Sequence, residues 1–239
     1  MDKMVYQVIE RIQRGLLTPV CICCGLAGTN SSDLCNACQS DLQLNYHYCQ
    51  RCAIALQVDE ITWCGACLRL PPRYDASFCA FKYGYPIDEF IRRLKYGHSL
   101  SHAAVLGQLL ADYLRQHRRG VLPECFVPVP LSTTRYRDRG FNQAIELGRV
   151  IEKSLGVQMQ TDLLQRVRHT TEQAGLSRRE RRKNLRNAFV VADSRVPQSV
   201  AVLDDVVTTG STVNEIARTL KRAGVQQIEV WAVARAPLR

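Results

Sequence analysis

The sequence predicts an α/β protein with a mainly parallel sheet, preceded by a cysteine-rich module that binds metal. Three observations support this prediction. After residue 73, short apolar segments of strand character alternate with segments of helical spacing, which is typical of β–α–β crossovers. Before residue 68, eight cysteines form four Cys-x-x-Cys pairs. The net charge is −1 over residues 1–72 and +11 over residues 73–239, so the two regions differ in composition as well.

The first 17 residues combine a short apolar pattern with charged side chains, and we expect an amphipathic helix there. They lack the apolar core and the small-residue cleavage site of a signal peptide. Nowhere does the chain approach the ~18 to 20 uninterrupted apolar residues that a membrane span needs. We therefore expect a cytoplasmic protein with no membrane span.

The cysteine module covers residues 18–72 and is expected to end at Pro71-Pro72, because proline cannot continue regular structure. Gaps of 10, 10 and 11 residues separate its four pairs, which are Cys21/Cys24, Cys35/Cys38, Cys49/Cys52 and Cys64/Cys67. Two Cys-x-x-Cys turns supply a tetrahedral sulfur site, the arrangement that zinc prefers. The module is therefore predicted to hold two structural zinc ions in two zinc ribbons.

The spacing leaves two questions about this module open. Because the gaps are nearly equal, the pairs can be combined in sequence or interleaved. An iron–sulfur cluster and a pair of redox dithiols compete with zinc, although nothing nearby indicates electron transfer. Closed four-cysteine sites supply folding energy to loop-rich segments, so we assign no catalysis to the module.

The remaining residues, 73–239, are predicted to form one α/β domain. Glycines at 156 and 224 are expected to end two of its helices. Residues 165–187 are dominated by arginine and are read as a loop or a solvated helix. The expected strands are 76–83, 125–130, 199–203 and 228–233, and the expected helices are 87–96, 103–114, 142–155 and 211–223.

The segment from 200 to 212 has the chemistry of a sugar-phosphate site. Its apolar strand is followed by Asp204 and Asp205, which can accept hydrogen bonds from a vicinal diol such as that of ribose. A hydroxyl-rich turn, 208–212, then enters a helix whose first N–H groups favour a phosphate. Gly210 lets the backbone approach the ligand closely. The alternative is an unrelated strand–turn–helix with a capping serine.

This segment resembles the 5-phosphoribosyl-1-pyrophosphate (PRPP) signature of type I phosphoribosyltransferases. The resemblance implies a type I phosphoribosyltransferase-like parallel sheet, and Mg²⁺ bound together with PRPP. For Lys95 and each arginine, a solvated surface charge is the alternative. The residues expected to bind PRPP are Asp204, Asp205, Thr208, Thr209, Gly210, Ser211, Thr212, Lys95, Arg135 and Arg139.

Over residues 18 to 236 the order of motifs resembles the ComF family of competence proteins (ComFC/GntX-like). The motifs follow the cysteine module in the order 94–96 (LKY), 128–131 (PVPL), 139–144 (RGFNQA), 173–176 (QAGL) and 203–206 (LDDV). The resemblance implies a cytoplasmic protein that takes part in DNA uptake during natural transformation. It also implies single-stranded DNA and a ComF-type helicase as partners.

The arginine-rich segment is the predicted DNA contact. Residues 165–187 carry a net charge of +6, which cannot be buried unpaired and must face solvent or a polyanion. The residues expected to bind DNA are Arg178, Arg179, Arg181 and Arg182. The alternative is a solvated loop whose arginines only help to bind pyrophosphate. A second functional reading is an active phosphoribosyltransferase acting on a nucleobase or nucleotide-type acceptor, and no catalytic residue is assigned.

Overall fold

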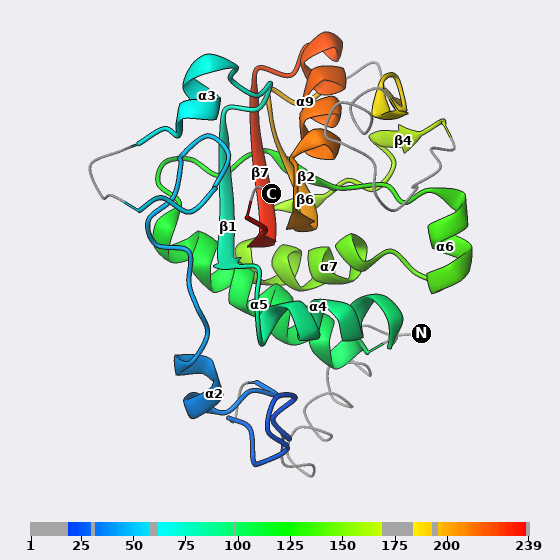
Figure 1. The fold of residues 1–239 in the computed structure, drawn as a ribbon. Coiled ribbons are helices and arrows are strands. Elements are labelled where there is room, and N and C mark those ends of the chain that lie inside the picture. The colour runs from blue at the N-terminus through cyan, green and yellow to red at the C-terminus, as the bar shows by residue number, and fades with distance from the viewer. Residues whose placement is uncertain are drawn as a thin grey trace. The chain divides into compact units, whose positions relative to one another are not determined.

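The computed structural model describes residues 19–29, 32–57, 62–97, 99–168, 184–192 and 196–237 (Figure 1). The helix expected over residues 1–17 lies outside these ranges. The chain divides into two compact units, Met1–Leu42 and Gln43–Arg239, and each is described by itself. The boundary expected at residue 72 stays a prediction.

The larger unit is built on a five-stranded sheet in the order β1-β7-β6-β2-β3, and every neighbouring pair of strands is parallel. The prediction of a parallel α/β sheet is therefore confirmed. Strand β6 lies in the middle, between β7 and β2, with Leu203 opposite both Trp231 and Pro128. The strands are β1 (Ala76–Lys82), β2 (Cys125–Pro128), β3 (Gln158–Met159), β6 (Ser199–Val207) and β7 (Gln227–Arg235).

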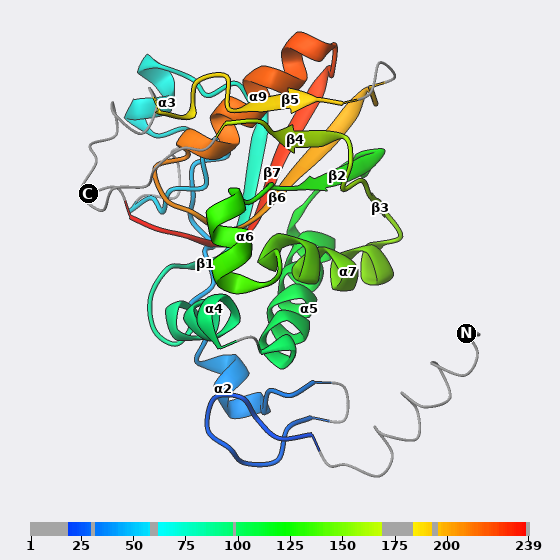
Figure 2. The ribbon, with the colours of Figure 1, turned by 90° about the vertical axis from the view of Figure 1, so that its right-hand side faces the viewer.

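Helices cover both faces of this sheet (Figure 2). On one face lie α4 (Ile87–Tyr96), α5 (Leu100–His117) and α7 (Gln143–Leu155), and on the other lies α9 (Ser211–Ala223). The rings of Phe126 and Trp231, 5.8 Å apart, belong to the core between the sheet and the first group of helices. Each face of a parallel sheet thus has its own apolar layer, as crossover connections require.

The helix boundaries follow from the sequence. In α4 the apolar residues at helical spacing, Ile87, Phe90, Ile91 and Leu94, are all buried. In α7 the close approach to the sheet requires Gly148, because a Cβ there would lie 2.4 Å from the sulfur of Met159. Both predicted stops are glycines in the left-handed conformation, with φ of 70° at position 156 and 112° at position 224.

Several elements differ from the expectation. Strand β6 continues through both aspartates to Val207, four residues beyond its expected end. A helix that was not expected, α6 (Thr133–Arg139), begins after the capping side chain of Ser132 and ends at Gly140 with φ 70°. The arginine-rich segment connects the two strands of a small antiparallel sheet, β4 (Leu164–Arg166), which contains its first two residues, and β5 (Phe189–Val191), which follows its last.

Two short helices complete the described structure. The smaller unit contains α2 (Asn36–Ser40), and the larger unit contains α3 (Gly65–Arg69). Among the helices in the described ranges, none combines the length and the apolar character that a membrane crossing requires.

Candidate functional site

The two aspartates lie near the carboxyl end of the central strand, with their side chains on opposite faces of the sheet. Successive side chains of a strand point to opposite faces, so Asp204 shares its face with Val202, which packs with the α9 layer. Asp205 points to the other face, toward α4 and α7, where it is 3% exposed. Ligands of open α/β sheets bind at the carboxyl ends of the strands, which is where these carboxylates lie.

The turn after β6 leads directly into α9. Gly210 precedes the helix with φ 73°, a left-handed conformation that is strained for a residue with a side chain. The hydroxyl of Thr209 donates to the hydroxyl of Ser211 at 2.9 Å, and the Ser211 N–H points to the Thr209 hydroxyl at 3.3 Å. Hydroxyls and the first N–H groups of a helix of 13 residues are therefore presented together at its positive end.

A cavity of about 440 Å³ opens beside this turn and receives side chains from α4, α6, α7, β4, β6 and α9 and from connecting loops. Eight of the ten residues predicted to bind PRPP line it, and these are Lys95, Arg135, Asp204, Asp205, Thr208, Thr209, Ser211 and Thr212. Gly210 shapes the turn itself and borders a second cavity. Residues more than 100 positions apart in the chain are thus gathered around one space.

Lys95, near the end of α4, forms an ion pair with the carboxylate of Asp205. Gln143, the first residue of α7, donates to the same carboxylate at 3.4 Å. Burial opposes the ionisation of Asp205, but the Lys95 ammonium outweighs it and lowers the pKa of Asp205 below its usual value. Asp205 is therefore a carboxylate whose charge is already compensated by the protein.

Asp204 has the opposite electrostatic character. Burial, and then the charge of Asp205 beside it, raise the pKa of Asp204 well above its ordinary value. The N–H of Asp205 donates to an Asp204 carboxylate oxygen at 2.9 Å. Two adjacent acids with pKa values shifted in opposite directions are typical of a functional site, and here they are ready for a ligand that brings hydroxyl donors or a cation.

The two arginines of the predicted pyrophosphate loop lie in different surroundings. Arg135, in α6, lines the cavity, and burial followed by the nearby charge of Arg139 lowers the pKa of its guanidinium. Arg139 is not among the residues that line the cavity. It is 6% exposed, and its guanidinium carbon lies 5.3 Å from the ring centroid of Tyr96, a cation–π contact. Arg135 can meet an anion directly, whereas Arg139 supports the wall.

Among the residues that line the same cavity, Tyr83, Gln143, Arg166 and Leu185 were not predicted to bind PRPP. Gln143 belongs to the motif 139–144, and its amide reaches Asp205. Arg166 belongs to the arginine-rich segment, and its guanidinium lies 5.7 Å from the ring of Phe189 across the β4–β5 pair. Tyr83 follows the last residue of β1, and no pattern in the sequence marks it as a site residue.

The predicted DNA contacts, Arg178, Arg179, Arg181 and Arg182, lie outside the described residues. Arg168 and Arg186, on either side of them, are exposed. Arg168 donates to the carbonyl of Arg186 at 2.9 Å, so the two ends of the segment meet.

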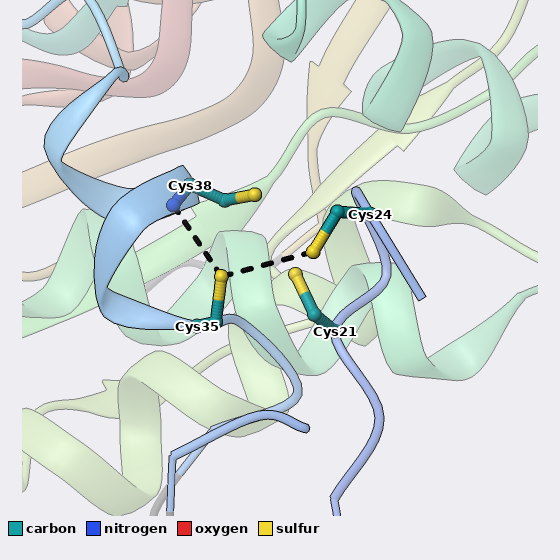
Figure 3. Close-up of side chains that lie close together, drawn as sticks. All are labelled: Cys21, Cys24, Cys35 and Cys38. Carbon is teal, nitrogen blue, oxygen red and sulfur yellow. Dashed lines mark hydrogen bonds between the residues drawn. The ribbon is translucent and has the colours of Figure 1, made fainter. Parts of the chain in front are cut away.

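The eight cysteines of the four pairs form two groups of four. In the smaller unit the sulfurs of Cys21, Cys24, Cys35 and Cys38 turn toward one another (Figure 3). The second group, in the larger unit, comprises Cys49, Cys52, Cys64 and Cys67. Within each group the sulfurs lie within 4.8 Å of one another. The pairs therefore combine in sequence, and the interleaved arrangement is excluded.

The spacing of the sulfurs fits a zinc ion. Four sulfurs at about 2.3 Å from a central Zn²⁺ would lie about 3.8 Å apart at the corners of a tetrahedron. The Sγ atoms of Cys24 and Cys35 are 3.8 Å apart, and those of Cys52 and Cys64 are 3.7 Å apart. Backbone N–H groups point to the sulfurs of Cys35 and Cys49, at 3.4 and 3.2 Å, which stabilises thiolates. Both groups are closed structural sites.

Comparison with known proteins agrees with this arrangement. Residues 12–89 match the double zinc ribbon domain family. A solved structure of glutamine PRPP amidotransferase from B. subtilis is similar at 21% identity, with a TM-score of 0.35, over 56% of this chain. The match covers 26% of that enzyme.

Two curated relatives match over nearly the whole chain. The "DNA utilization protein YhgH" of Salmonella typhimurium is 34% identical over 84% of this chain and 90% of its own length. "Competence protein F" of Haemophilus influenzae is 37% identical over 90% of this chain and 96% of its own length. The chain therefore belongs to the competence protein F (ComF) family.

Proposed function

We propose that this protein binds PRPP in the cavity at the end of β6 and handles single-stranded DNA in natural transformation. One observation supports the PRPP site above all others. Asp204 and Asp205 straddle the central strand at the same cavity that receives the hydroxyl-rich turn 208–212 and two cations, Lys95 and Arg135. A diol, a phosphate and a pyrophosphate, the three polar parts of PRPP, each find complementary groups there.

The chemistry of each group suggests its place. The ribose hydroxyls would donate to Asp204 and Asp205. The 5-phosphate would accept from the N–H groups and hydroxyls of 208–212. Arg135 and Lys95 would face the pyrophosphate, and Lys95 would then divide its charge between Asp205 and the ligand. Mg²⁺ would enter with PRPP and neutralise pyrophosphate charge, because carboxylate and phosphate oxygens are the ligands it prefers.

DNA handling is proposed from the family and from the surface chemistry. Residues 73–239 carry a net charge of +11, which favours polyanions. Three exposed tyrosines belong to elements that wall the cavity, namely Tyr83 after β1, Tyr96 beside Lys95 and Tyr136 beside Arg135. Exposed aromatic rings next to arginines are typical of surfaces on which unpaired bases stack. We further propose a cytoplasmic location and a ComF-type helicase as partner.

Turnover of PRPP decides between a binding protein and a phosphoribosyltransferase. The experiment measures pyrophosphate release from PRPP and Mg²⁺ by the zinc-loaded protein, with nucleobases and with single-stranded DNA as acceptors, alongside calorimetric binding of PRPP. Binding without release supports a PRPP-responsive DNA-handling protein. Release above the background of a variant lacking Asp204 and Asp205 supports an active transferase. If the protein neither binds PRPP nor releases pyrophosphate, the PRPP site is refuted.

A further inference from the structure

A single arginine joins the second cysteine group to the turn that follows β6. Arg235, the last residue of β7, is 5% exposed. Its Nε donates to the carbonyl oxygen of Cys52 at 2.7 Å, across 183 residues of sequence. Its Nη1 donates to the carbonyl of Val207 at 2.9 Å and also to that of Thr208. One guanidinium therefore connects a residue of the second sulfur site with the end of β6 and the first residue of the turn 208–212.

These hydrogen bonds have the strength to fix geometry. Donation from a charged guanidinium is about twice as strong as a neutral hydrogen bond, and the planar group imposes directions on its acceptors. Among the described residues, the acceptors that Arg235 reaches are backbone carbonyls, including Ala236 at 2.7 Å. Four thiolates around one Zn²⁺ carry net negative charge, so the loaded site would also favour this buried cation.

A second connection runs through Tyr74, which is 3% exposed. Its hydroxyl lies 3.6 Å from the position that a Cβ of Gly210 would take. Its carbonyl accepts a hydrogen bond at 2.8 Å from Arg51, which lies between Cys49 and Cys52 and stacks on Trp63. The second ribbon is therefore connected to the turn through Tyr74 as well as through Arg235.

The turn depends on these connections because cavities flank it. Besides the first cavity, one of about 370 Å³ lies between α3 and α9 and is lined by Cys52, Cys67, Thr209 and Gly210 together with Arg235. Figure 1 shows α3 beside α9 at the same end of the sheet. A loop with open space on two sides has few packing contacts to restrain it, so each hydrogen bond to its backbone matters more.

We propose that Arg235 is a positioning residue through which metal binding at the second cysteine group orders the turn 208–212. Loss of zinc from Cys49, Cys52, Cys64 and Cys67 frees the Cys52 carbonyl, releases the guanidinium and loosens the turn. Loss of zinc from the first group should leave the turn unchanged, because among the described residues the cysteine to which Arg235 donates belongs to the second group. The two zinc ions therefore differ in their effect on the turn 208–212. The part of this inference that concerns PRPP rests on the proposed function.

Two matched cysteine variants test the inference. Cys35 and Cys64 each belong to one sulfur group, each is partly buried, and each precedes a five-residue helix. Cys35→Ser and Cys64→Ser are compared in the full-length, zinc-treated protein, after metal analysis has shown one zinc fewer per chain in each. Hydrogen exchange is followed on peptides that cover 208–212, with peptides from α7 as the measure of global folding.

Exchange at 208–212 is expected to rise at least about tenfold in Cys64→Ser, and to remain within about twofold of wild type in Cys35→Ser, because only the former loses a charge-assisted contact to the turn. Unchanged exchange in Cys64→Ser would overturn the inference. So would equal acceleration in both variants, which would indicate a general loss of stability. This measurement needs no ligand, so it decides the coupling even if the protein fails to bind PRPP.

Substitutions of the arginine separate its geometry from its charge. Arg235→Gln removes both, whereas Arg235→Lys keeps the charge but cannot reach the carbonyls of Cys52 and Val207 together. Both should accelerate exchange at 208–212, and both should weaken calorimetric binding of PRPP with Mg²⁺ about tenfold, the effect of losing about 1.4 kcal/mol. Wild-type exchange and affinity in Arg235→Lys would show that charge alone matters and would contradict the positioning role. If neither arginine variant folds, hydrogen exchange in Cys35→Ser and Cys64→Ser still tests the inference.

Discussion

The ammonium group of Lys95, near the end of α4, forms an ion pair with the carboxylate of Asp205 in the central strand. The Lys95 side chain is 21% exposed and that of Asp205 is 5% exposed, so solvent screens the pair only in part. This contact allows a charged residue to lie within the sheet, and it places a cation beside the cavity before any ligand arrives.

Removing the lysine should destabilise the protein. Lys95→Met leaves the Asp205 carboxylate buried without its cation, and we expect the free energy of unfolding to fall by about 1 to 3 kcal/mol, the usual cost of a buried group that loses a charged partner. Urea unfolding measures the change. The double variant Lys95→Met/Asp205→Asn should recover most of the loss, because no uncompensated charge remains. Additive losses in the double variant would show that the pair is not coupled.

Asp204 should lower stability at neutral pH, because its pKa is raised in the folded protein. A carboxyl with a raised folded-state pKa favours the folded state only while it is protonated. Its contribution is therefore lost as the pH rises from near 3.8, its ordinary value, through the raised folded value. Asp204→Asn should raise the free energy of unfolding by about 0.5 to 2 kcal/mol at pH 8.

The same substitution should raise stability less at pH 5 than at pH 8, and it should weaken PRPP binding at both. A loss of ligand affinity together with a gain of stability is expected of a residue kept for function. Urea unfolding at the two pH values measures the stability part. An equal or larger gain at pH 5 would contradict the direction of the shift.

Metal content follows from the two sulfur groups. Protein that has never met a chelator should contain two zinc ions per chain, because each group presents four sulfurs at tetrahedral spacing. Elemental analysis measures this content. One ion or none, or iron in place of zinc, would refute the assignment of both groups.

Single-stranded DNA should bind through phosphate contacts of the arginine-rich segment. Affinity should fall steeply with salt, by roughly 0.7 in log K per tenfold rise in salt for each phosphate neutralised. Changing Arg178, Arg179, Arg181 and Arg182 together to glutamine should flatten this slope, as measured by fluorescence anisotropy with labelled oligonucleotides. The control removes four exposed arginines elsewhere, which are Arg115, Arg119, Arg149 and Arg222.

The control variant should keep most of the wild-type slope. If instead the segment variant binds DNA like wild type, the DNA site lies elsewhere, and the exposed Tyr96 and Tyr136 become the next residues to replace by alanine. If the segment variant loses PRPP affinity and keeps DNA affinity, the main role of the segment is the small ligand.

Local patterns predicted much of the fold. The bounds of α4 and α9 match the expected helices because apolar spacing and, for α9, a glycine stop act within one element. Strand β6 was expected to end before Asp204, where its apolar run ends. It continues because Lys95, more than 100 residues earlier, pairs with Asp205. Helix α6 was missed because its seven residues carry no apolar periodicity, and its caps define it instead.

The candidate site was predictable where one segment carries its chemistry. The residues from Asp204 to Thr212 form a continuous motif, and most of them line the first cavity. Tyr83 and Arg166 were not predictable, because only the folded sheet brings β1 and β4 to that cavity. The contact between Arg235 and Cys52 spans 183 residues, and neither residue carries a signal for the other. Long-range pairing of this kind has no local signature.

The most direct test of the PRPP site is calorimetric titration of PRPP with Mg²⁺ into the zinc-loaded protein. Wild type should bind, and Asp204→Ala, Asp205→Ala and Thr209→Val should each bind more weakly. Loss of each carboxylate should cost about 1.5 to 3 kcal/mol, the value of a hydrogen bond to a charged group. The exposed Asp162→Ala serves as the control and should bind like wild type. Wild-type affinity in the Asp204→Ala/Asp205→Ala double variant would contradict the account.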